Sequence, residues 1–140
     1  MPTVRDVLAQ KNSAVVYTCA PGVTLAEASR LLCDRGVGCL VVADDDGAVQ
    51  GVLSDRDVVR AVAAGRDPAR TPVAQAMSTS AAAVELEAPL EEVARLLRRR
   101  RVRHLPVVGR RGLLGVVSLG DLARFYTLRE RASAEAAALQ

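Results

Sequence analysis

The order of apolar and polar residues predicts a helix, two strands and a second helix in the first half of the chain. Apolar residues recur at helical spacing within 24–35, at Leu25, Ala28, Leu31 and Leu32. Thr24 precedes this stretch as a candidate N-cap, and Gly36 follows it as a candidate C-terminal stop. The run CLVVA then predicts a buried strand, DDDG a hairpin turn, AVQGVLS a returning strand, and DRDVVRAVAAG a helix that ends at Gly65.

The second half of the chain repeats this pattern, which indicates an internal duplication. Residues 24–42 match 89–108 at a constant offset, and the stretch GVLSDRD (51–57) matches GVVSLGD (115–121). The repeat predicts a helix over 90–101, a strand over 104–108, a turn over 109–112, a strand over 113–117 and a helix over 119–128. Each copy also has a candidate lead-in strand, AVVYT (14–18) in the first and AAAVEL (81–86) in the second.

These elements predict an α+β fold in which two β-α-β-β-α repeats pack sheet against sheet with pseudo-twofold symmetry. Each copy is too small to bury a comfortable core alone, so a shared core between the copies is expected. The expected organisation is a first repeat over 1–66, a linker over 67–74, a second repeat over 75–128 and a C-terminal helical tail over 129–140. Such a pair would hold two equivalent clefts between its copies.

The composition indicates a globular protein with an aliphatic core, since 50% of the residues are hydrophobic but only 2% are aromatic. No apolar run is long enough for a membrane helix, and the N-terminal MPTVRDVLAQ lacks the features of a signal peptide. The three cysteines, Cys19, Cys33 and Cys39, form an odd set without metal-ligand spacing. We therefore expect a cytoplasmic protein with reduced thiols, no membrane association and no metal.

The net charge of +3 comes from a basic set that is almost entirely arginine, with Lys11 as the one lysine. Arginine suits fixed contacts to phosphate, and a codon bias towards arginine would give the same composition. The stretch RRRRVR (98–103) is either a phosphate or nucleic-acid patch or the solvated last turn of a helix. Because aromatic side chains for base stacking are nearly absent, nucleic acid is not the expected partner.

The repeated Ser-x-x-Asp lies where a strand gives way to a helix. Ser54 and Ser118 could donate a hydroxyl to a phosphate at the helix start, and Asp57 and Asp121 could accept the two hydroxyls of a ribose. The same spacing is also a capping box, in which serine and aspartate only satisfy the first turn of the helix. The residues leave both interpretations open, because a duplicated fold repeats its caps together with its sites.

The chain resembles a tandem pair of cystathionine-beta-synthase-type domains, called CBS domains. The resemblance rests on GVLSDRD and GVVSLGD, which match the family's Gly-apolar-apolar-Thr/Ser-x-x-Asp, on VRHLPVV (102–108), and on the order of elements. DRDVVRAVAAGRDP further resembles small stand-alone bacterial CBS-pair proteins. The family implies binding of AMP, ADP, ATP or S-adenosylmethionine in the clefts between the repeats.

The resemblance also implies the role of individual residues. Ser54 and Ser118 would contact phosphate, and Asp57 and Asp121 would hold the ribose. Arg56 could reach a phosphate. The groups that would flank the base or the phosphates are Val37, Gly38 and Cys39 in the first copy and Arg103, His104 and Pro106 in the second. Because Gly38 and Cys39 in one copy correspond to Arg103 and His104 in the other, we expect unequal affinities of the two clefts.

The expected function is a ligand-sensing regulatory module that forms a homodimer and regulates a partner protein in trans. The ligand would be an adenine nucleotide such as AMP or ATP, with no further cofactor. The alternative is a basic scaffold or nucleic-acid-associated protein with empty clefts. An enzyme is not expected, because His104 is the one histidine and no nucleophile is arranged with it in the sequence.

Overall fold

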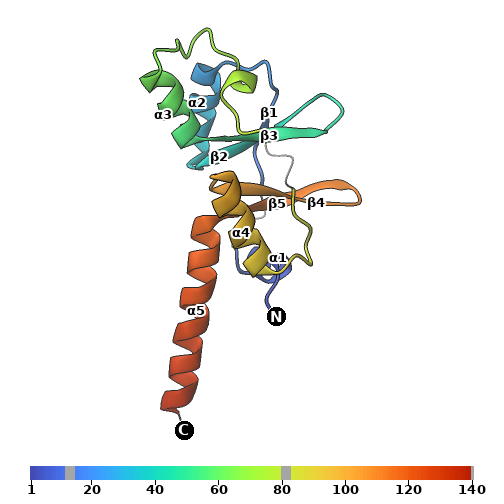
Figure 1. The fold of residues 1–140 in the computed structure, drawn as a ribbon, viewed down its shortest axis with the longest axis vertical. Helices are drawn as coiled ribbons and strands as arrows, with labels where there is room; N and C mark the ends of the chain where they lie inside the picture. Colours follow the sequence, from blue (N-terminus) through green and yellow to red (C-terminus); the bar gives the residue numbers. More distant parts are fainter. Residues whose placement is uncertain (12–14, 80–82, 140) are drawn as a thin grey trace.

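The computed structural model describes residues 1–11, 15–79 and 83–139 (Figure 1). The first half forms a three-stranded sheet with the order β1-β2-β3, made of β1 (Thr18–Cys19), β2 (Cys39–Ala43) and β3 (Val49–Ser54). Strand β1 runs parallel to β2, and β2 runs antiparallel to β3. Two helices complete this half, α2 (Leu25–Arg35) and α3 (Asp55–Ala63). The helix-strand-strand-helix order predicted from the sequence is confirmed.

The second half repeats this order with one very long helix at its end. Strands β4 (His104–Gly109) and β5 (Gly112–Ser118) form an antiparallel pair between α4 (Leu90–Arg100) and α5 (Leu119–Ala138). The predicted helix over 119–128 and the predicted helical tail form the single 20-residue helix α5. This helix extends away from the rest of the molecule (Figure 1).

The two halves match residue by residue where each hairpin meets its following helix. Cys39 pairs with Ser54 across β2 and β3, and His104 pairs with Ser118 across β4 and β5. The two sheets lie one above the other, with β3 close to β4 (Figure 1). The expected fold of two α+β repeats packed with pseudo-twofold symmetry is therefore confirmed.

The two lead-in strands are shorter than the sequence predicts. Of the predicted strand 14–18, only Thr18 is in a strand among the residues that the structure describes, and residue 14 lies outside them. Residues 15–17 instead line a cleft, and the carbonyl oxygen of Tyr17 accepts the N–H of Val41 in β2 at 3.0 Å. In the second copy, Val84 forms one isolated bridge with Val107, and residues 81 and 82 lie outside the described ranges.

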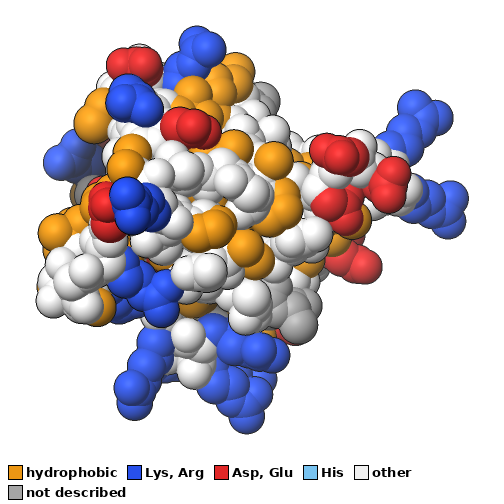
Figure 2. Space-filling view, turned by 90° about the horizontal axis from the view of Figure 1, so that it is seen from above, with side chains coloured by type: hydrophobic (Ala, Val, Ile, Leu, Met, Phe, Trp, Pro, Cys, Tyr) orange, Lys and Arg blue, Asp and Glu red, His pale blue; other side chains and the backbone are white. Residues whose placement is uncertain are grey.

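Charged side chains are unevenly distributed over the surface. Seen from above, Lys and Arg side chains gather at the lower edge of the molecule, and the Asp and Glu side chains lie mostly elsewhere (Figure 2). The DDDG segment forms the predicted hairpin turn, in which the Asp44 carboxylate accepts the N–H groups of Asp46 and Ala48 at 3.0 and 2.9 Å. The Asp44 carboxylate therefore stabilises the turn.

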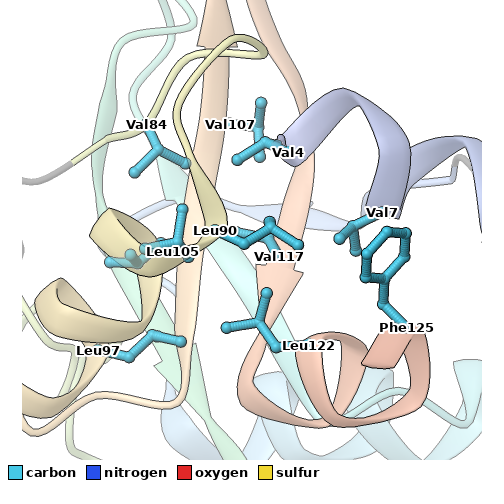
Figure 3. Packing of buried hydrophobic residues seen from close by; sticks show 11 residues of the cluster. Val4, Val7, Val84, Leu90, Leu97, Leu105, Val107, Val117, Leu122 and Phe125 are labelled. Carbon is cyan, nitrogen blue, oxygen red and sulfur yellow. The ribbon is translucent and has the colours of Figure 1, made fainter. Parts of the chain in front are cut away.

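Each repeat has its own hydrophobic cluster, and each cluster is completed by a segment from outside its repeat. Helix α1 (Val4–Gln10), which the sequence pattern did not predict, places Val4 and Val7 among the buried residues of the second repeat (Figure 3). The 3-10 turn η1 (Val73–Gln75) places Val73 in the cluster of the first repeat. Helix α1 therefore packs with the second repeat, although it lies within the range 1–66 expected for the first.

Candidate functional site

The two Ser-x-x-Asp motifs form matching capping boxes at the starts of α3 and α5. Ser54 Oγ accepts the N–H of Asp57 at 3.2 Å, and Asp57 Oδ2 accepts the N–H of Ser54 at 2.8 Å. The corresponding distances between Ser118 and Asp121 are 3.0 and 2.9 Å. Both carboxylates are buried by this arrangement, with exposures of 7% and 8%. The capping interpretation of the motif is thus confirmed.

The caps leave hydrogen-bonding capacity for a ligand. In each box the aspartate uses Oδ2 for the cap, and among the described residues Oδ1 has only a more distant arginine, Arg60 at 3.5 Å from Asp57 and Arg124 at 3.9 Å from Asp121. Each serine accepts a hydrogen bond and keeps its own hydroxyl proton for donation. A capping role and a ligand-binding role are therefore compatible.

Asp121 lies in an open cleft of about 400 Å³, which we call the Asp121 cleft. The second repeat contributes Ser118 and Asp121 to it, and the first repeat contributes Val37, Gly38 and Cys39. A Cβ at Gly38 would be 3.9 Å from the nearest heavy atom, so the wall at this glycine is open rather than filled by neighbours. The cleft thus joins the cap of one repeat to a wall with small side chains from the other.

The Asp121 cleft also contains Lys11, at the C-terminal end of α1. Its Nζ donates to Asp121 Oδ2 and to the carbonyl oxygen of Val116, both at 2.9 Å. The ammonium group therefore neutralises the buried carboxylate and keeps one further N–H for donation near the start of α5, where an anion is already favoured.

Asp57 lies in a much smaller cavity of about 40 Å³, which we call the Asp57 cleft. Ser54, Arg56 and Arg60 line it from the first repeat, and Arg101 and Arg103 line it from the second. The arrangement of Ser and Asp is the same as in the Asp121 cleft, but the opposite wall carries arginines in place of glycines. Only a small group can enter this cavity without movement of those side chains.

Two titratable side chains at equivalent positions stay uncharged near neutral pH. Burial raises the pKa of the Cys39 thiol to about 11. Burial lowers the pKa of His104, with Asp55 and Asp121 acting in the opposite direction. His104 lines both clefts, and its Nδ1 is buried without a hydrogen-bond partner among the described residues.

No helix in the described part of the chain is long and apolar enough to cross a membrane. Within residues 1–11, 15–79 and 83–139, no three His, Cys, Asp or Glu side chains gather in a way that could hold a metal ion.

The family model named CBS domain matches this chain twice, over residues 4–64 and 73–128. The chain belongs to the CBS-domain family. The CBS domain-containing protein YhcV of Bacillus subtilis is 36% identical over 124 residues, which cover 88% of this chain and 84% of that protein.

Solved structures of other CBS-domain proteins have the same fold. A CBS-domain containing protein from Agrobacterium tumefaciens superposes with a TM-score of 0.79 at 31% identity, covering 89% of this chain and 98% of that one. The CBS domain pair of protein MJ0100, solved with 5′-methylthioadenosine and S-adenosylmethionine, superposes with a TM-score of 0.79 at 21% identity. It covers 92% of this chain and 98% of its own, and at this identity it shows the shared fold alone.

The CBS fold distributes the expected site residues over both clefts, each of which combines one repeat's cap with the other repeat's wall. Val37, Gly38 and Cys39 meet Ser118 and Asp121 in one cleft. The other cleft brings together Ser54, Arg56, Asp57, Arg103 and His104. Pro106 is buried within β4, where its carbonyl oxygen accepts the N–H of Val84 at 3.0 Å, and it is not among the lining residues of either cleft.

The sequence pattern of this CBS pair did not identify Lys11 and Arg60 as cleft residues. Lys11 lies more than a hundred positions before Asp121, and only the packing of α1 against the second repeat brings the two together. Arg60 lies one helical turn after Asp57, so its spacing could have been noticed from the sequence. The signal for Lys11 was weaker, because only its being the sole lysine distinguishes it.

Proposed function

We propose that this CBS pair is a regulatory module that binds an adenosine-type nucleotide in the Asp121 cleft and acts on a partner protein in trans. The observation that carries the proposal is the combination of a free serine hydroxyl, a buried carboxylate and a lysine on one side of an open cleft with a wall of small residues on the other. The module would act by binding and not by catalysis.

The cleft offers suitable chemistry for each part of a nucleotide. Its volume of about 400 Å³ is within the range of small-molecule sites, roughly 300 to 1,000 Å³. Asp121 Oδ1 could accept a ribose hydroxyl, and the Ser118 hydroxyl, the Lys11 ammonium and the start of α5 could bind a phosphate. Tyr17 and Val37 offer apolar surface for the base.

Binding in this cleft would link the two repeats. A ligand that touches the cap of the second repeat and the wall of the first would favour the packing in which both surfaces fit it. The adenosyl compounds bound by the pair of protein MJ0100 support this ligand class. Lys11 favours AMP or ATP over S-adenosylmethionine, because a cation beside the phosphate position attracts phosphate and repels a sulfonium.

Exposed apolar residues support a homodimer as the regulatory unit. Val59 and Val62 on α3 are 65% and 53% exposed, and Leu119 on α5 is 52% exposed. Apolar side chains on the faces of two helices are suited to contact with a second copy or with the partner protein.

Calorimetric titration with AMP, ATP and S-adenosylmethionine tests the proposal, using Gly38→Arg to fill the Asp121 cleft. This substitution introduces the residue found at the equivalent position of the other repeat, and Gly38 has room for a Cβ. We expect AMP or ATP to bind the wild type, and the variant to bind on the order of 100-fold more weakly.

Gly22→Arg is the matched control, because Gly22 is exposed and a Cβ added there would have no heavy atom within 4 Å. It should bind the nucleotide like the wild type. Absence of binding to all three ligands would overturn the proposed function. Equal binding by Gly38→Arg and the wild type would move the site to another part of the molecule.

A further inference from the structure

The Asp57 cleft is surrounded by arginines that the adenosine proposal does not use. Arg56 and Arg60 reach it from α3, and Arg101 and Arg103 reach it from the loop between α4 and β4. A groove of about 570 Å³ continues from it and is lined by Arg60, Arg101 and, in addition, Arg100. Five arginines from two repeats therefore line the Asp57 cleft and the adjoining groove, which share Arg60 and Arg101.

These arginines have few anionic partners within the protein. Across the described ranges, Arg60 pairs with Asp57 at 3.5 Å, while no ion pair involves Arg56, Arg100, Arg101 or Arg103. The Asp57 carboxylate is 7% exposed and already accepts a hydrogen bond from the backbone of Ser54. The Asp57 cleft and the adjoining groove thus have an excess of positive charge.

The backbone at Arg101 indicates that its side chain matters at this place. Arg101 ends α4 with a φ of 56°, a left-handed conformation that strongly favours glycine. The equivalent residue of the first repeat, Gly36, has a φ of 63°. The second repeat therefore carries an arginine where the backbone conformation itself gives no reason for one.

The volume of the small cavity restricts which group can lie against Ser54 and Asp57. The cavity beside Ser54 and Asp57, of about 40 Å³, is far below the size of a nucleoside site, roughly 300 Å³ or more. The groove over Arg60, Arg100 and Arg101 is open and has a volume of about 570 Å³, so it has room for further charged groups beside the small cavity. Guanidinium groups bind phosphate oxygens with paired hydrogen bonds.

We propose that the Asp57 cleft and its groove form an oligophosphate site, which binds a chain of two or more phosphates through Arg56, Arg60, Arg101 and Arg103. The phosphate next to Ser54 and the start of α3 occupies the small cavity, and the following phosphates lie along the groove. The chain belongs either to a free oligophosphate or to a nucleotide whose nucleoside stays outside. This site is separate from the Asp121 cleft, so it does not depend on the proposed adenosine function.

Calorimetric titration with inorganic tripolyphosphate tests this site in Arg101→Gly. Because glycine suits the backbone conformation at this position, the variant should melt no lower than the wild type, and its folding is not in doubt. We expect wild-type protein to bind one tripolyphosphate and the variant to bind it about tenfold more weakly. Arg110→Gly, which removes the same charge from the β4–β5 turn, is the matched control and should bind normally.

Further titrations on Gly38→Arg separate the two clefts and the two sources of the phosphate chain. Unchanged tripolyphosphate binding by Gly38→Arg supports the proposal, and its loss would place the anion in the Asp121 cleft and overturn it. If ATP binds this variant in competition with tripolyphosphate, the site accepts the phosphate chain of a nucleotide. If tripolyphosphate binds and ATP does not, the ligand is a free oligophosphate. Either result supports the site.

Two results would overturn the proposal of an oligophosphate site and leave the proposed adenosine function unaffected. One is the absence of tripolyphosphate binding by a wild-type protein that binds AMP. The other is equal weakening by Arg101→Gly and Arg110→Gly together with binding of duplex DNA, which would indicate a general polyanion surface in place of a defined site.

Discussion

The Asp121 cleft and the Asp57 cleft have the same capping box but differ tenfold in volume, about 400 against 40 Å³. The opposite walls of the two clefts also differ. Gly36 and Gly38 border the larger cleft, and the equivalent residues in the other repeat, Arg101 and Arg103, border the smaller one. The smaller cleft thus has arginines at two positions where the larger cleft has glycines.

This comparison separates what the duplicated fold needs from what a ligand needs. The serine and aspartate of each motif are required for the start of a helix, so both repeats have them whatever the clefts bind. The residues of the opposite wall do not cap a helix start, and at these positions the two repeats differ. The motif therefore identifies the architecture, and the wall determines which ligand fits.

The largest expected effect concerns Gly51 and Gly115, which occupy equivalent positions in the two repeats but have different space for a side chain. A Cβ at Gly51 would lie 2.5 Å from the backbone oxygen of Ser78, which is hydrogen-bonded to Val52 and has little room to move. At the equivalent Gly115 it would meet a Leu8 methyl group at 3.3 Å, which can shift. We expect Gly51→Ala to lower the free energy of unfolding by about 3 kcal/mol and Gly115→Ala by less than about 1 kcal/mol. Urea unfolding of both variants measures the difference, and equal losses would contradict it.

The second prediction uses Cys39 as a reporter of the Asp121 cleft. Because the pKa of this buried thiol is raised to about 11 from 9.0, its reactive thiolate near pH 8 is about 100-fold scarcer than that of an ordinary cysteine. Iodoacetamide should therefore modify the exposed Cys33 first and Cys39 on the order of 100-fold more slowly than an ordinary thiol. Peptide mass spectrometry over time follows both sites. Rapid labelling of Cys39 would mean that the wall of this cleft opens readily.

The third prediction concerns Lys11, a cation that pairs with the aspartate of the second repeat's motif and lines the Asp121 cleft but not the Asp57 cleft. Lys11→Met should weaken AMP binding about tenfold and leave adenosine binding nearly unchanged, because the ammonium would act on the phosphate. Lys11→Arg is the conservative control and should retain much of the affinity for AMP. If Lys11→Met loses both ligands to the same extent, the lysine supports the shape of the cleft and does not select phosphate.

The sequence was sufficient to predict the repeat, the helices α2 to α5, both hairpins and both caps, because each of these depends on local pattern. It was not sufficient to predict α1, because this seven-residue helix is stabilised by the packing of Val4 and Val7 in the hydrophobic cluster of the second repeat. Lys11 was missed as a cleft residue for the same reason. The sequence comparison of Gly38 with Arg103 predicted unequal affinities, which stay a prediction, and the tenfold difference in cleft volume needed the three-dimensional structure.

The smallest expected effect concerns His104, which occupies the position that Cys39 has in the first repeat. Burial lowers the pKa of His104 in the folded protein, and Lys11 and Arg103 add to this effect while Asp55 and Asp121 oppose it. As the pH falls below about 6.5, the unfolded chain takes up a proton that the folded protein does not bind. Stability is therefore complete above that pH, and it decreases below it until the pH reaches the folded-state pKa.

The decrease can be measured by urea unfolding at pH 7.5, 6.5 and 5.5, and its slope cannot exceed about 1.4 kcal/mol per pH unit for one proton. His104→Asn replaces the one histidine of the chain with an uncharged side chain and should flatten the profile in this interval. Cys39→Ser is the matched control at the equivalent position of the other repeat and should keep the slope. An identical slope in the wild type and in His104→Asn would assign the pH dependence to carboxylates, and the two wall positions would then differ in size and chemistry but not in their response to acid.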